Sequence, residues 1–93
     1  MSSLVIKLSS VDYGKTKNWL VFKGFIPQHD INKLYTFEFC GTELNTDAYL
    51  TDDFREQLLE KLDENFGYPP FSNLKGIQNK LSDENYYRIE LRN

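Results

Sequence analysis

The chain has 93 residues and a formal net charge of −3, and 40% of its residues are hydrophobic, 27% charged and 15% aromatic. This length leaves no room for a second domain of ordinary size, and the balance of hydrophobic and charged residues excludes a disordered or fibrous chain. One histidine and one cysteine cannot supply the roughly four nitrogen or sulfur ligands of a structural zinc site. We therefore expect a single folded domain over residues 1–93.

Three segments with alternating side chains predict β-strands in the first half of the chain. They cover residues 4–8, 19–26 and 34–40, and Pro27 ends the second. Only short polar turns separate these segments. Because parallel neighbours would need long crossover connections, the three strands are expected to form an antiparallel meander.

The hydrophobic period then changes to that of a helix. Apolar residues at helical spacing over 52–66 predict an amphipathic helix. Thr51 or Asp53 can supply its N-cap, and Gly67 stands where a residue with positive φ is expected after the helix. A shorter helix is predicted over about 72–81.

Alternation returns over residues 86–92 and predicts a last strand. The order along the chain is then β-β-β-α-α-β. Since the strands and the helices are partly segregated, the sequence predicts an α+β fold, an antiparallel sheet of about four strands with the helices packed on one face.

The first residues carry no targeting signal that we recognise. Residues 1–8 lack the basic segment and long apolar stretch of a signal peptide, and no run approaches 18 apolar residues. A single cysteine forms no internal disulfide, which suits a reducing compartment. We therefore expect a cytoplasmic protein with no membrane partner.

Negative charge is concentrated in the middle of the chain. Residues 40–64 hold eight acidic and two basic residues, a net charge of −6 that leaves +3 for the rest. Glu56, Glu60 and Glu64 recur at every fourth position of the predicted helix. Like charges at this spacing oppose one another by about 0.2–0.5 kcal/mol per pair.

Two interpretations of this acidic helix remain open. A row of charges is most often the solvated face of an amphipathic helix, and acids in the first turn also favour the helix dipole. The alternative is a surface that meets a positively charged partner. The candidate partner-binding residues are Asp52, Asp53, Glu56, Glu60, Asp63 and Glu64.

Strand alternation also places aromatic and basic side chains on the sheet face away from the helices. Loops, including the long segment 41–50, can cover such a face and make it a second small core. Left open, it is an interface for a protein or for a second copy of this chain, or a platform on which unpaired bases stack. The candidate residues are Trp19, Lys23, Phe25, Tyr86 and Arg88.

Nucleic acid is the less favoured partner of that face. The segment Lys23-Gly24-Phe25 resembles the opening of the RNA-recognition-motif signature. Pro27 interrupts the strand where that motif continues with an aromatic residue, and no helix separates the first two predicted strands. The net negative charge also opposes tight binding of a polyanion.

No pattern typical of catalysis is present. The five glycines are isolated, so no phosphate-binding loop is indicated. His29 falls in a predicted turn, and Cys40 ends an aromatic strand where it acts as a small hydrophobic residue. Glu43 and Asp47 could share a metal, but nothing in the sequence holds them together. The sequence predicts no catalytic residue, metal site or cofactor.

These features favour a small non-enzymatic protein that acts as an inhibitor or adaptor by covering a basic surface of a partner protein, for example one that binds nucleic acid. Toxin-immunity proteins and phage-encoded inhibitors of bacterial defence, including anti-CRISPR proteins, share this size and charge, and the comparison rests on those two properties. The alternatives are a single-stranded nucleic-acid or RNA-binding module and a self-associating structural subunit such as a homodimer, both using the aromatic sheet face.

Overall fold

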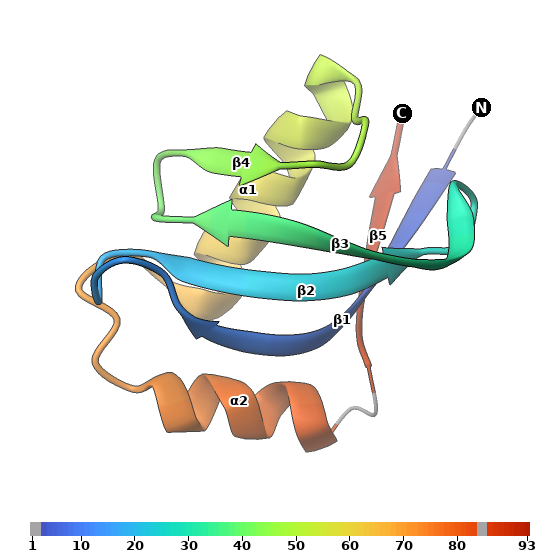
Figure 1. Ribbon diagram of the computed structural model, residues 1–93. Helices are drawn as coiled ribbons and strands as arrows, with labels where there is room; N and C mark the ends of the chain where they lie inside the picture. Colours follow the sequence, from blue (N-terminus) through green and yellow to red (C-terminus); the bar gives the residue numbers. More distant parts are fainter. Residues whose placement is uncertain (1–2, 84–85) are drawn as a thin grey trace.

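The computed structural model describes residues 3–83 and 86–93. Within them the chain forms a five-stranded antiparallel sheet and two helices, with the strands in the order β4-β3-β2-β1-β5 (Figure 1). The elements are β1 (Ser3–Tyr13), β2 (Leu20–Ile26), β3 (Asp30–Phe39), β4 (Leu44–Thr46), α1 (Asp52–Phe66), α2 (Leu74–Asp83) and β5 (Tyr87–Arg92). No helix in this part of the chain is long and apolar enough to cross a membrane.

The predicted α+β class and the broad order of strands and helices are confirmed. The prediction of about four strands misses β4, because three residues are too few to show a period. This strand pairs with β3, with Phe37 opposite Thr46 and Phe39 opposite Leu44. The segment 41–50 therefore extends the edge of the sheet, and its Leu44 is buried in the core.

The first strand is longer than the sequence indicates. It continues to Tyr13, because the pairing of β1 with β2 shifts between Leu8 and Ser10, which is a β-bulge. The bulge returns Val11 to the buried face after two exposed serines. The break in alternation that predicts a strand end is therefore an irregularity within a single strand.

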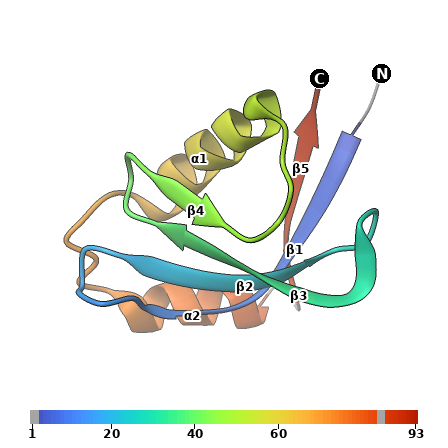
Figure 2. The ribbon, with the colours of Figure 1, turned by 45° about the horizontal axis from the view of Figure 1, so that its top comes forward.

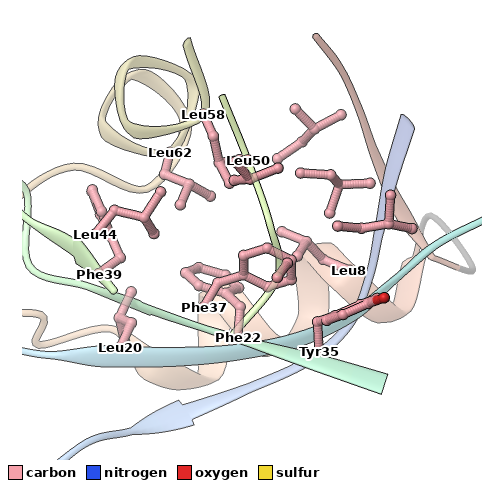
Figure 3. Close-up of a cluster of buried hydrophobic side chains, with 14 of the residues drawn as sticks. Leu8, Leu20, Phe22, Tyr35, Phe37, Phe39, Leu44, Leu50, Leu58 and Leu62 are labelled. Atoms are coloured by element: carbon pink, nitrogen blue, oxygen red, sulfur yellow. The ribbon is translucent and has the colours of Figure 1, made fainter. Parts of the chain in front are cut away.

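The main core lies between the sheet and the helices. Figure 3 shows the leucines of α1 facing the aromatic rings of β2 and β3. The rings of Phe22 on β2 and Phe66 on α1 lie 5.0 Å apart between centroids. Strand alternation puts Leu20, Phe22, Tyr35, Phe37, Tyr87 and Ile89 on the other face of the sheet from the aromatic and basic candidate residues. All of them are buried except Tyr87, which is half-buried.

The first helix has the predicted limits, and its caps explain them. Thr51 is the N-cap, since its hydroxyl accepts a hydrogen bond from the backbone N–H of Phe54 at 3.2 Å. Asp53 lies inside the first turn instead. Gly67 has a φ of +80° and donates its backbone N–H to the carbonyl of Asp63 at 2.9 Å, which closes the helix.

The second helix covers the part of β1 that β5 leaves unpaired. Strand β5 pairs with residues 3–8 only, and α2 runs beside the rest of β1 (Figure 2). The amide of Gln78 donates to the carbonyl of Val11 at 3.0 Å, and Leu81 is buried against the core. The helix starts two residues later than predicted, at Leu74, and continues to Asp83.

Candidate functional site

The acidic side chains of α1 all point into solvent. Every one of the six predicted partner-binding residues is exposed, and together we call them the acidic surface. They are Asp52, Asp53, Glu56, Glu60, Asp63 and Glu64.

Little in the structure compensates this negative charge. Over residues 3–83 and 86–93 the ion pairs join Glu90 to Arg88 and Arg92, and none reaches the acidic surface. Arg55, on the same helix, donates a guanidinium hydrogen bond to the carbonyl of Leu44 at 2.8 Å. This hydrogen bond joins Arg55 to β4 and not to a carboxylate of the acidic surface.

The two ends of the acidic surface differ in what they do to the helix. Asp52 and Asp53 lie in the first turn, near the positive end of the helix dipole, where an acid is stabilising. Asp63 and Glu64 lie near the negative end, and the last turn holds no basic residue. Each of these charges opposes the dipole by about 0.3–1 kcal/mol. Helix stability therefore accounts for the first pair and not for the second.

The open face of the sheet carries a second candidate surface. Lys7 on β1 stands opposite Phe25 on β2 and opposite Arg88 on β5. The rings of Phe25 and Tyr86 pack edge to face with centroids 6.0 Å apart. A hollow of about 250 Å³ lies here, and the residues lining it, which we call the aromatic patch, are Lys7, Phe25, Pro27, Ile31 and Tyr86.

Only part of this patch is predictable from the sequence. The prediction misses Pro27 and Ile31, which lie in the β2–β3 connection and at the start of β3, outside any alternating pattern. Ile31 is 72% exposed. Its one signal in the sequence is that it is an isolated apolar residue between polar neighbours. Lys23 is exposed, but it stands opposite Ser10 and Thr36 and lies outside the patch.

Trp19 is not part of the aromatic patch. It directly precedes β2, whereas Phe25 lies near the other end of that strand. Trp19 instead lines a separate hollow with Asp63 and Tyr68, at the C-terminal end of α1. The structure therefore divides the predicted aromatic face into two sites.

The positive charge near the aromatic patch is partly neutralised. The carboxylate of Glu90 accepts hydrogen bonds from the guanidinium of Arg92 and lies 3.6 Å from that of Arg88. The hydrogen bond and the charge of Arg92 hold the pKa of Glu90 below its ordinary value. The same contacts raise the pKa of Arg92. This local pairing weakens the attraction of the face for a polyanion.

The other polar residues considered as catalytic or metal-binding candidates are exposed or make contacts within the fold. His29 is exposed in the turn before β3, and Cys40 is half-buried with its Sγ 3.7 Å from the hydroxyl of Thr42. The carboxylate of Asp47 accepts the backbone N–H of Thr36 at 3.0 Å, which ties the connection after β4 to β3. Across the described residues, no three His, Cys, Asp or Glu side chains are grouped to hold a metal ion.

The fold and these surfaces define a small α+β protein with one acidic and one aromatic candidate binding surface. No protein-family model, curated protein or solved structure matches the chain.

Proposed function

We propose that this protein binds a basic surface of a partner protein through the acidic surface of α1, as an inhibitor or adaptor. The observation that carries the proposal is the exposure of six carboxylates on one helix, with no ion pair to any of them among the described residues. Two of these carboxylates oppose the dipole of their own helix. A positively charged partner would relieve that cost.

Electrostatics also indicates the kind of partner. Surfaces that bind nucleic acid carry dense lysine and arginine, and a complementary acidic surface accelerates association with them and makes it dependent on salt. The net charge of −6 over residues 40–64 supports a protein that covers such a surface. A cytoplasmic location is part of this proposal, since the lone cysteine suits a reducing compartment.

The test compares two double charge reversals. The tagged protein is used as bait in lysate of the cell that produces it, with nuclease treatment and a salt gradient, and the affinity of a captured protein is then measured. We expect Glu56→Lys with Glu60→Lys to weaken binding by at least about tenfold and to flatten its salt dependence. The control, Glu38→Lys with Asp83→Lys, makes the same change in net charge at exposed positions outside α1.

Two results would contradict the proposal. One is equal affinity of the α1 reversal and the wild-type protein for the captured partner. The other is loss of the partner on nuclease treatment, because nucleic acid would then be the molecule that is bound.

A specific observation favours self-association as a second candidate. Ile31 and Tyr86, both in the aromatic patch, are 72% and 48% exposed, and Glu90 neutralises part of the adjacent positive charge. These features favour an apolar contact between copies over base stacking. Sedimentation analysis should then give a dimer that Phe25→Ser disrupts, whereas Tyr49→Ser, an exposed aromatic residue outside the patch, leaves it intact. Binding of a single-stranded oligonucleotide at Phe25 would contradict it.

A further inference from the structure

A hollow of about 600 Å³ opens at the C-terminal end of α1, next to the end of the acidic surface. Its lining includes two aromatic residues and one acidic residue. The lining residues used below are Trp19, Asp63, Tyr68 and Pro69.

Backbone contacts hold the residues around this hollow in place without a ligand. The carbonyl of Trp19 accepts a hydrogen bond from Gly14 at 2.9 Å, which closes the β1–β2 turn. Gly41, with a φ of +98°, follows β3, and a Cβ placed on it would lie 3.1 Å from Tyr68 and 3.2 Å from Pro69. The turn after β3 therefore packs directly under Tyr68 and Pro69, where only glycine fits without strain.

The hollow is lined by the residue types that bind a cation, which are aromatic residues and a carboxylate. Tyr68 is 77% exposed, so its ring is open to a ligand, and the half-buried Trp19 lines the same hollow. In the described part of the chain the carboxylate of Asp63 makes no hydrogen bond or ion pair. The negative end of the α1 dipole adds to its charge. Aromatic faces and a carboxylate together attract a cation.

We propose that this hollow receives an arginine side chain of the basic partner. A guanidinium group is planar, so it stacks on aromatic rings while its N–H groups reach a carboxylate. An ammonium group is a compact, strongly hydrated charge that cannot do both as well. This inference rests on the proposed function of the acidic surface, and it names the residue type that the partner contributes and its place on this chain.

The chain carries its own reporter for the test. Trp19 is the only tryptophan, so the emission of the protein reports directly on the hollow. The probes are tetra-arginine amide and tetra-lysine amide, which have equal charge, titrated at low ionic strength. We expect tetra-arginine amide to change the emission of Trp19 and to bind about fivefold or more tightly than tetra-lysine amide.

Variants test whether tetra-arginine amide binds in this hollow. Asp63→Asn and Tyr68→Ala should each weaken tetra-arginine binding about five- to tenfold and abolish its preference over tetra-lysine. Asp83→Asn is the matched control, because it removes one exposed charge that lies outside the acidic surface, and it should change the affinity less than about twofold. All three side chains are exposed, and thermal unfolding of each variant verifies that the fold is retained.

The outcomes separate the two proposals. Equal binding of both peptides without a change in Trp19 emission would overturn the arginine site and leave the acidic surface standing. An emission change that survives Asp63→Asn and Tyr68→Ala would also overturn the site. Binding of neither peptide at low ionic strength would overturn the acidic surface as a binding surface, and the arginine site with it.

Discussion

The side-chain amide of Gln57 bonds to both backbone groups of Arg92, 35 residues further along the chain. Its Oε1 accepts the N–H of Arg92 at 2.9 Å, and its Nε2 donates to the Arg92 carbonyl. Gln57 lies on α1, and Arg92 ends β5, which is an edge strand of the sheet. An edge strand presents unpaired backbone groups that invite other chains. At this position α1 takes the place of a further strand.

Gln57→Ala should therefore destabilise the protein by about 1–2 kcal/mol, since two hydrogen bonds contribute about 1 kcal/mol each. Hydrogen exchange at the Arg92 amide should become faster at the same time. Chemical denaturation and exchange measured by NMR test both expectations. Glu60→Ala, an exposed position on the same helix, should change stability by less than about 0.5 kcal/mol. Unchanged exchange at Arg92 would show that the contact is unimportant in solution.

Gly24→Ala should destabilise the sheet by about 1–3 kcal/mol. A Cβ on Gly24 would lie 2.6 Å from the carbonyl oxygen of Lys7 and 3.1 Å from the Cα of Leu8, both backbone atoms of β1. The strands would have to move apart at the bulge. Thermal unfolding measures the loss, with the neighbouring exposed Lys23→Ala as the control. A melting temperature equal to that of the control would contradict this account.

Leu62→Ala and Leu59→Ala compare the same chemical change on two faces of α1. Leu62 is fully buried beneath the sheet, whereas Leu59 is half-buried at the margin of the core. We expect a loss of about 2–5 kcal/mol for Leu62→Ala and a clearly smaller loss for Leu59→Ala. Urea denaturation gives both values, and equal losses would mean that the packing of α1 is misassigned.

The charges at the two ends of α1 should have opposite effects on stability. Glu64→Gln removes a negative charge near the negative end of the helix dipole and should stabilise the protein by about 0.3–1 kcal/mol. Asp52→Asn removes a favourable charge at the other end and should destabilise it by a similar amount. Thermal unfolding at low salt measures both. A stabilising Asp52→Asn, or a destabilising Glu64→Gln, would remove the argument that the last turn holds its acids for a partner.

Glu90 should titrate below the ordinary glutamate pKa of 4.5, because Arg92 and, more weakly, Arg88 favour its charged form. A lowered pKa means that the pairing stabilises the fold at pH values above 4.5 and that this contribution is lost as the pH falls through the lowered value. NMR titration of the Glu90 carboxyl measures the shift. Arg92→Gln should return the pKa of Glu90 toward the ordinary value. A Glu90 pKa that stays low in this variant would contradict the assignment of the shift to Arg92.

Local patterns in the sequence were sufficient for the main elements of the fold. The limits of α1 follow from apolar residues at helical spacing and from a cap at each end, and these are interactions within a few residues of one another. The buried faces of β2 and β3 follow from alternation, because a strand has a strict period of two. The bulge after Leu8 could not be predicted from the sequence, since a shift in register against β2 is a property of two strands together.

In the candidate sites, too, some features follow from the local sequence and others depend on contacts between distant residues. The six acids of the acidic surface could be read from the sequence, because a regular helix puts residues of fixed spacing on its outer face. Their lack of ion pairs could not, since it depends on where Arg55 binds across the fold. Trp19 shares its face with Phe25 in a strand pattern, but only the packed structure shows that Trp19 lines a hollow with Tyr68, whereas Phe25 packs against Tyr86. The sequence by itself thus determined which residues are helical, extended, buried or charged. The tertiary structure decided which distant side chains meet, because those contacts depend on register, twist and loop packing that no local period encodes.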